Sequence, residues 1–292
     1  MTADLDGTVD LRAWIGREEI RSDVVSPDLA ARYHATLDLP GAPPQEGAPA
    51  PRLIYHCMTP QTVPTGMLAS DGHPQRGGFL PPVPLPRRMW AGSSIRFHRD
   101  IRVGDTVDRV SRIADVTTKE GRTGPLCFVT VDHLLSVAGA AVVSERQNIV
   151  FRGPESGTLG KPPVPAAGGD RRRIIVPSTP LLFRYSAILF FAHRIHYDRT
   201  YATEVEGYPG LVVHGPLQAA LLIHFATEAR GVAPDRFTFR SGSPLFDDSA
   251  FVLNATDEGE SMRLWTARER GPAAMTAEAS WDKTGTVERG SA

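Results

Sequence analysis

Apolar residues recur at helical spacing near the start of the chain. Leu29, Tyr33 and Leu37 are four residues apart, which places them on one face of a helix. Ser26 followed by Pro27 is typical of a helix start, because a serine side chain caps free N–H groups and proline suits the first turn. We therefore expect a helix that begins at Pro27 and ends near Leu37.

Four strand-like runs follow in the first half of the chain. Apolar and polar residues alternate in them, and turn-forming residues separate them at 103–105 and 119–124. The runs cover residues 90–98, 106–118, 126–136 and 140–151. This pattern predicts an antiparallel meander after the first helix.

The second half repeats the order of helix and meander. A short strand is expected at 174–176, then an irregular segment up to Gly210, and then a helix over 215–230 that ends before Gly231. Further strands are expected at 237–246, 250–256, 262–268 and 273–281. One helix followed by a meander, twice, predicts an α+β protein in which each sheet wraps around one helix.

Proline and glycine divide the chain between these elements. Residues 40–86 are rich in both and predict one extended surface loop, of a length that is typical of lids. Residues 153–173 predict a linker, so the expected domains are 1–152 and 174–292, with a loose tail at 283–292. The chain length of 292 residues suits two domains of this size.

The charge balance excludes several kinds of partner. Lys and Arg number 32 against 33 for Asp and Glu, a net charge of -1, so neither a nucleic acid nor an anionic membrane is expected to bind. The two cysteines, Cys57 and Cys127, form no disulfide framework. No signal peptide and no apolar run of about 20 residues is found, which favours a cytoplasmic location.

Histidines gather in the second half. His193, His196, His214 and His224 lie within 32 residues, although the chain has only nine histidines. An imidazole titrates near neutral pH and suits acid–base catalysis. The two-residue gap between His193 and His196 also suits zinc, but no nearby residue completes a ligand pattern, so no metal is expected. The five histidines of the first half are expected to be ordinary surface or core residues.

The start of the second helix offers a possible anion site. Gly215 followed by Pro216 leaves a backbone N–H free at a helix N-terminus, and no side chain blocks a ligand there. Such a group can hold the oxygen of a thioester carbonyl as it becomes an enolate. His-Gly-Pro is also ordinary sequence for a helix start.

Several strings resemble one known family. They are FRYSA at 183–187, HRIHYD at 193–198, EGYPGLVVHGPL at 206–217, LPRRMWAG at 85–92, RVGD at 102–105 and KEGRTGP at 119–125. Together they make residues 10–282 similar to the MaoC-like dehydratase and hydratase family, in particular its mesaconyl-CoA and itaconyl-CoA hydratases and mitochondrial 3-hydroxyacyl thioester dehydratases. The resemblance implies a double hotdog fold, two antiparallel sheets each wrapped around a long central helix.

The resemblance also implies a reaction. These enzymes add water reversibly to the double bond of an acyl thioester, carried on CoA or an acyl carrier protein, with neither metal nor redox cofactor. It implies that His196 is the catalytic histidine and that the Gly215 N–H faces the thioester oxygen. We expect His193 to assist His196. A homodimer is expected. The residues expected to bind substrate are Phe191, Arg194, Tyr197, Asp198, Tyr208, His214, Arg87, Arg88 and Trp90.

Phe191 departs from the family pattern. Five residues before the catalytic histidine, the family carries an aspartate or asparagine, whereas phenylalanine can neither orient water nor exchange a proton. Two alternatives therefore remain open beside hydration. One is a repurposed hotdog enzyme, such as a cyclase, isomerase or eliminase. The other is a protein that binds acyl thioesters without turnover.

Overall fold

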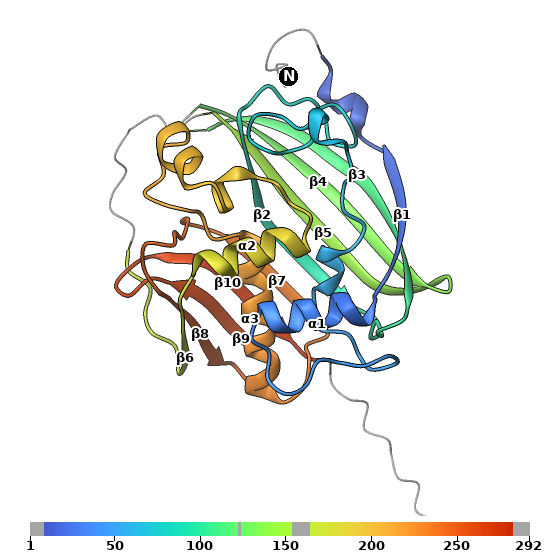
Figure 1. Ribbon diagram of the computed structural model, residues 1–292, viewed down its shortest axis with the longest axis vertical. Coiled ribbons are helices and arrows are strands. Elements are labelled where there is room, and N and C mark those ends of the chain that lie inside the picture. The colour runs from blue at the N-terminus through green and yellow to red at the C-terminus, as the bar shows by residue number, and fades with distance from the viewer. Residues whose placement is uncertain (1–8, 122–123, 154–163, 283–292) are drawn as a thin grey trace, which may run out of the picture.

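Ten strands form one continuous antiparallel sheet in the computed structural model, which describes residues 9–121, 124–153 and 164–282 (Figure 1). The strand order is β1-β3-β4-β5-β2-β7-β10-β9-β8-β6. The strands are β1 (Glu18–Val24), β2 (Arg87–Phe97), β3 (Thr106–Gly121), β4 (Gly124–Val137), β5 (Ala140–Arg152), β6 (Arg171–Ile175), β7 (Arg236–Ser241), β8 (Phe251–Asp257), β9 (Ser261–Ala267) and β10 (Ala273–Ser280). The first five belong to the first half of the chain and the other five to the second. The pattern predicts five strands in the second half but only four in the first, so β1 is a strand that it missed.

The helices are few. They are α1 (Pro27–Thr36), α2 (Thr179–Ile188) and α3 (Gly215–Arg230), with short helical turns η1 (Leu11–Trp14), η2 (Ile54–Cys57), η3 (Thr65–Met67), η4 (Arg194–His196) and η5 (Tyr201–Val205). In Figure 1, α1 and α2 cross in front of α3. The predicted helices at 27–37 and 215–230 are both confirmed.

The two halves join through β2 and β7. Gly92 pairs with Arg240, and Ile95 pairs with Phe237. A Cβ atom at Gly92 would collide with the carbonyl oxygen of Phe239, so only glycine lets the two strands approach this closely. The sheets of the two halves therefore merge into one, where the sequence pattern predicts two.

Helix α3 is the core of the second half. It packs against β7, β8, β9 and β10, and all residues from Leu217 to Ala226 are buried. A helix that is apolar on every side needs such enclosure. Gly231 ends it in the left-handed conformation, with φ of +77°, as expected for a glycine cap.

The first half lacks a matching long helix among the described residues. Its helix α1 has ten residues, begins at the Ser26 cap as predicted, and packs against α2. Helix α2 lies in the segment up to Gly210 that was expected to be irregular, so that expectation is wrong. Helix α2 starts with the same residue types as α1, since Ser178 caps it and Pro180 lies in its first turn.

The proline-rich segment 40–86 contains no long helix or strand before β2, as predicted, but it is not confined to the surface. Leu53, Ile54 and Tyr55 are almost completely buried, and the segment also lines the cavity described below. The expectation of a loop that only wraps the surface is therefore wrong. Apolar side chains within the segment hold it against the sheet.

Two predicted boundaries shift. Strand β6 begins at Arg171, inside the predicted linker of 153–173. Strand β7 ends at Ser241, five residues before the predicted end at 246, because Gly242 and Pro244 lead the chain out of the sheet. Residues 154–163 of the predicted linker and the predicted tail at 283–292 lie outside the described residues.

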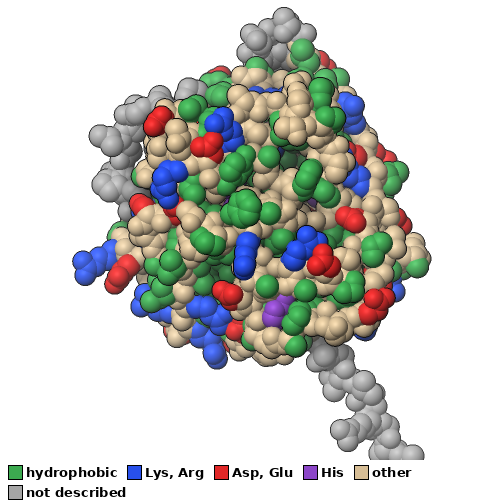
Figure 2. Space-filling view, viewed as in Figure 1, with side chains coloured by type: hydrophobic (Ala, Val, Ile, Leu, Met, Phe, Trp, Pro, Cys, Tyr) green, Lys and Arg blue, Asp and Glu red, His purple; other side chains and the backbone are tan. Residues whose placement is uncertain are grey.

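Acidic and basic side chains are interspersed on the face that Figure 2 shows. This agrees with the balanced composition and with the absence of a large basic field there. Among the described residues, no helix has the length and apolar character that crossing a membrane requires.

Candidate active site

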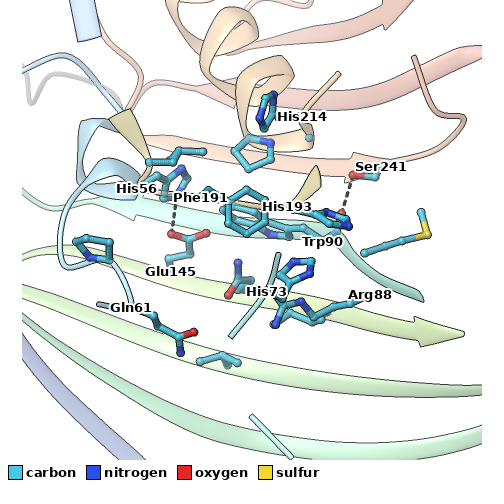
Figure 3. A pocket seen from close by; sticks show the side chains of 18 of the residues that line it. His56, Gln61, His73, Arg88, Trp90, Glu145, Phe191, His193, His214 and Ser241 are labelled. Carbon is cyan, nitrogen blue, oxygen red and sulfur yellow. Dashed lines mark hydrogen bonds and ion pairs between the residues drawn. The ribbon is translucent and has the colours of Figure 1, made fainter. Parts of the chain in front are cut away.

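A cavity of about 430 Å³ is lined by residues of both halves (Figure 3). The second half contributes the segment before η4, the residues up to the start of α3, and the end of β7. The first half contributes the proline-rich segment and strands β2 to β5. Of the residues predicted for the site, the cavity is lined by Arg88, Trp90, Phe191, His193, His196, His214 and Gly215.

Four histidine rings form a continuous row in this cavity. The rings of His196 and His214 stack with centroids 3.7 Å apart, and His193 lies edge-on to His196 at 5.3 Å. On the other side, His193 lies 4.1 Å from His73, which comes from the proline-rich segment. The row therefore crosses from one half of the chain to the other.

The hydrogen bond of His196 fixes its tautomer. Its Nδ1 lies 2.7 Å from the carbonyl oxygen of Val212, which can only accept, so Nδ1 carries the proton. Nε2 is then unprotonated, and no hydrogen bond joins it to another described residue. Burial lowers the pKa of His196 to about 4, so the ring is neutral at physiological pH. His196 thus presents a free acceptor in the cavity.

The N-terminus of α3 is uncapped at the same place. His214 occupies the cap position, but its side chain makes no capping bond; its Nε2 is instead hydrogen-bonded to Ser186 Oγ at 2.8 Å. The N–H of Gly215 donates to no described residue. A Cβ at this glycine would meet only Ser241 Oγ, at 3.8 Å, so the backbone is accessible from the cavity. The partial positive charge of a helix start favours an anion here.

Phe191 places an apolar ring in the middle of the cavity. Its centroid lies 5.1 Å from that of His73 and 5.9 Å from those of His193 and His196. The ring offers neither a donor nor an acceptor to the histidines around it. The side chain at position 191 therefore cannot exchange a proton.

Asp71 and His73 form a hydrogen-bonded pair beside Phe191. The His73 Nδ1 lies 2.9 Å from Asp71 Oδ2, and the His73 backbone N–H donates to Oδ1, also at 2.9 Å. Burial alone raises the pKa of Asp71, but these bonds and the His73 charge hold it well below its usual range. Burial and the nearby Arg88 lower the pKa of His73. The pair is thus a carboxylate and a neutral imidazole near neutral pH.

The same region contains a group of possible metal ligands. One ligand atom each from Asp71, His73 and His193 lies within 4.8 Å of the others. The sequence pattern did not predict this group, because the two residues that complete it, Asp71 and His73, lie at least 120 positions before His193. However, a hydrogen bond already joins Nδ1 of His73 to Oδ2 of Asp71.

A second pair, His56 and Glu145, lies on the other side of Phe191 in Figure 3. Glu145 accepts from His56 Nε2 at 3.1 Å, from the Tyr55 hydroxyl at 2.9 Å and from the Ser93 hydroxyl at 2.6 Å. Burial alone raises the pKa of Glu145, but His56, His133 and the hydrogen bonds lower it to about 2. Its carboxylate is fully engaged with protein groups.

The three predicted arginines differ in their partners. Arg87 donates to the Glu206 carbonyl oxygen at 3.2 Å and stacks over Tyr208. Arg194 binds Asp198, with Nη2 and Oδ2 2.7 Å apart. Arg88 alone of the three lines the cavity, and its side chain forms no hydrogen bond or ion pair with any described residue. Burial lowers the pKa of Arg88 to about 10, which leaves it charged at neutral pH.

Five residues predicted to bind substrate do not line the cavity. They are Arg87, Arg194, Tyr197, Asp198 and Tyr208. Tyr197 donates to the Ala192 carbonyl oxygen, and Asp198 accepts from the backbone N–H of Tyr201. These residues are neighbours of cavity residues in the sequence, and their predicted role in substrate binding stays a prediction. Trp90 and His214 do line it, as predicted.

Sequence reasoning missed most of the polar residues that the first half contributes. His56, His73 and His133, expected to be ordinary histidines, line the cavity, as does Glu145. The usable signal was local: Asp71-Gly-His73 is a turn in which a carboxylate and a histidine are two residues apart. The sequence around Glu145 gave no indication of its place in the cavity, because its hydrogen-bond donors come from distant segments of the chain.

Comparison with known proteins identifies the family. Residues 53–247 match the family model described as hydroxyacyl-thioester dehydratase type 2. The chain belongs to this family. It is 43% identical to a protein named mesaconyl-C(4)-CoA hydratase from Chloroflexus aurantiacus, over 92% of this chain and 97% of the relative. It is 25% identical to the mitochondrial hydroxyacyl-thioester dehydratase type 2 of Schizosaccharomyces pombe, over 70% and 76% of the two chains. The chain is thus an enzyme of the hydro-lyase type, and the predicted family is confirmed.

Solved structures confirm the fold. The crystal structure of HtdX from Mycobacterium tuberculosis matches with a TM-score of 0.66 at 20% identity, covering 91% of this chain and 99% of that one. A second protein of that organism, described as having a double hotdog fold, matches with a TM-score of 0.56 at 13% identity over 91% and 96% of the chains. The α+β double hotdog prediction is therefore correct.

Proposed function

We propose that this enzyme adds water to the double bond of an acyl-CoA thioester that carries a free carboxylate, a substrate of the mesaconyl-C4-CoA type. The observation that carries the proposal is the free Nε2 of His196 in a cavity that also contains the uncapped start of α3 at Gly215. The name of the 43% identical relative supports the substrate class.

In the proposed reaction, the Gly215 N–H and His196 Nε2 have different roles. The thioester oxygen becomes negative as the enolate forms, and the Gly215 N–H with the helix dipole stabilises that charge. His196 Nε2 accepts a hydrogen bond from the attacking water and orients it toward the β-carbon. His193 and His214 keep His196 in place through ring contacts. No step requires a redox cofactor.

Arg88 supports the proposed preference for a substrate with a free carboxylate. In a mesaconyl thioester with the sulfur on C4, the free carboxylate is attached to the β-carbon, where water adds. The buried Arg88 guanidinium, which has no hydrogen-bond or ion-pair partner among the described residues, is suited to bind it, because arginine presents paired donors to a carboxylate. Bound at Arg88, the substrate would have its β-carbon near His73 and its thioester toward α3.

The decisive experiment is turnover of mesaconyl-C4-CoA by the His196→Ala variant. We expect hydration, followed by the loss of enoyl thioester absorbance, to fall at least about 100-fold, as for removal of an acid–base group. The matched control is His98→Ala, since His98 is exposed and its side chain bonds only Ser144 Oγ among the described residues. Activity of the His196 variant equal to that of the control would disprove the assignment.

A second candidate is the repurposed hotdog enzyme, which Phe191 favours because its ring replaces the polar residue of the family. It predicts that the wild type hydrates neither mesaconyl-C4-CoA nor crotonyl-CoA, and that Phe191→Asn introduces such activity. Hydration by the wild type would exclude it. The predicted homodimer and cytoplasmic location stay predictions.

A further inference from the structure

We propose that His73, held by Asp71, is the second acid–base residue of this active site and performs the proton exchange that Phe191 cannot. The inference rests on the proposed hydratase function and extends it to the first half of the chain. It concerns a pair that comes from the proline-rich segment rather than from the segment that carries His196.

The hydrogen bonds leave one atom of the pair open. Both oxygens of Asp71 accept from His73, Oδ1 from the backbone N–H and Oδ2 from Nδ1–H. Nε2 of His73 therefore carries the lone pair, and no hydrogen bond joins it to a described residue. Since His73 lines the cavity and is only 10% exposed, this acceptor is sheltered from bulk solvent.

The backbone fixes the pair against the second half. The Arg194 N–H donates to the Asp71 carbonyl oxygen at 2.9 Å, and Arg194 Nη1 donates to the Ser70 carbonyl oxygen at 3.1 Å. Gly72 has φ of +90°, and a Cβ there would collide with the Ala192 carbonyl oxygen. Only glycine allows this contact. The loop is therefore positioned by the same segment that leads to His196.

The rings of His73 and His196 both contact the ring of Phe191. Phe191 touches both rings, with centroids at 5.1 Å and 5.9 Å, and His193 also lies between them. A polar side chain at position 191 would occupy the space next to both imidazoles. The Asp71–His73 pair offers its acceptor from the neighbouring side of the same space.

The two histidines differ in how well each can hold a proton. The ring N–H of His196 faces a neutral carbonyl, and the ring itself stacks on the buried His214 ring, so a protonated His196 is poorly stabilised. The ring N–H of His73 faces a carboxylate, which stabilises an imidazolium and fixes its orientation. A proton taken from water is therefore better held on His73.

The step balances with one water and no co-reactant. One O–H bond of water breaks toward His73 Nε2 while the oxygen bonds to the β-carbon, and the π electrons move to form the enolate, held by Gly215 N–H. The second hydrogen stays on the new hydroxyl, hydrogen-bonded to His196 Nε2. The His73 imidazolium then protonates the α-carbon as the carbonyl re-forms, and the neutral ring returns.

The test compares His73→Ala, Asp71→Asn and the His98→Ala control on mesaconyl-C4-CoA. We expect kcat to fall about 100-fold to 10,000-fold in both active-site variants, with KM changed less than about threefold. Asp71→Asn keeps the shape of the side chain and one of the two acceptor atoms, its single amide oxygen, so it removes less of the structure than His73→Ala does. Circular dichroism and the melting temperature check that each variant is folded.

A pH profile separates catalysis from a structural role. The charged and titratable groups around His73 are Asp71, Arg88, Arg76, His193 and His196. Because the carboxylate raises the pKa of His73, its removal must lower that pKa, and the acid limb of kcat/KM must move to lower pH in Asp71→Asn. An unmoved limb, or kcat equal to the control, would overturn the proposal.

Two further outcomes identify the cause of a failure. If the wild type hydrates the substrate and His196→Ala does not, but His73→Ala is fully active, only the role of His73 is wrong. If the wild type does not hydrate it, the proposed function itself fails. A third outcome is loss of activity on treatment with EDTA and its recovery on addition of one divalent metal. This outcome would overturn the proposed acid–base role of His73 and would instead indicate a metal bound by Asp71, His73 and His193.

Discussion

Two histidine–carboxylate pairs line the same cavity, but they differ in what they leave open. Glu145 has a side chain only 2% exposed, and three protein donors occupy it, among them His56. The Asp71 side chain is 24% exposed, and among the described residues its carboxylate accepts hydrogen bonds from His73 alone. The first pair is closed within the protein, and the second presents a free ring nitrogen to the cavity.

Both pairs consist of a histidine and a carboxylate, so their residue types do not distinguish them. They differ in where the second ring nitrogen of the histidine lies, the one that does not bond the carboxylate. His56 bonds Glu145 through Nε2, and its Nδ1 is buried without a hydrogen-bond partner in the described residues. His73 bonds Asp71 through Nδ1, so Nε2 is the atom that reaches the cavity. We therefore assign stability to the closed pair and proton exchange to the open pair.

The largest predicted contrast is in turnover. Asp71→Asn should lower kcat on mesaconyl-C4-CoA about 100-fold to 10,000-fold, because the carboxylate orients and stabilises the catalytic ring. Glu145→Gln, which is the same change in the closed pair, should lower kcat less than about fivefold. Steady-state kinetics of the two variants side by side checks this, and equal losses would remove the distinction between the pairs.

The next contrast concerns the arginine beside the open pair. Arg88→Met should raise KM for mesaconyl-C4-CoA about 10-fold to 100-fold, since a hydrogen bond to a charged group contributes about 1.5–3 kcal/mol. Crotonyl-CoA lacks the carboxylate, so the ratio of kcat/KM for the two substrates should fall by a similar factor. Arg88→Lys should recover part of the loss, because lysine keeps the charge but not the paired donors. An unchanged ratio would show that the carboxylate binds elsewhere.

Stability should show the reverse order of the two pairs. Glu145→Gln should lower the free energy of unfolding by about 1–3 kcal/mol, because a fully buried carboxylate loses charge-assisted hydrogen bonds to three donors. Asp71→Asn should lower it by less than about 1 kcal/mol, since its side chain is partly exposed. Urea denaturation measures both. A larger loss in Asp71→Asn would assign the structural role to the open pair.

The smallest effect is a shift in pH dependence. The Arg88 charge lowers the pKa of His73, so Arg88→Met must raise it, and the neutral base form is then lost at a higher pH as the solution is acidified. The acid limb of kcat/KM should therefore move to higher pH, opposite to its movement in Asp71→Asn. Profiles on crotonyl-CoA measure this without the carboxylate contact, and a shift to lower pH would contradict it.

Local patterns predicted most of the fold. The start of α1 at Ser26 and Pro27 and the end of α3 at Gly231 follow from single residues whose backbone preference is strong. Helix α2 was missed although Ser178 and Pro180 repeat that pattern. The merging of the two sheets at Gly92 could not be predicted, because it depends on contact with Phe239, far away in the sequence.

The site was predictable only where its residues are neighbours in the chain. His193, His196, His214 and Gly215 come from two short motifs, and the cavity brings them together. His73 comes from a segment whose prolines predict a loop but not its contacts, and those contacts arise from the packing of Gly72 on Ala192. Sequence spacing alone does not reveal a site shared between two halves.

The most direct test of the account is a double-variant cycle in the hydration of mesaconyl-C4-CoA. The rates of the wild type, His73→Ala, His196→Ala and the combined variant are measured under the same conditions. If both histidines act on one water molecule, each single variant loses most of the activity, and the combined variant loses about as much as the more damaging single one. Losses that multiply, or a single variant with full activity, would contradict a site shared by the two halves.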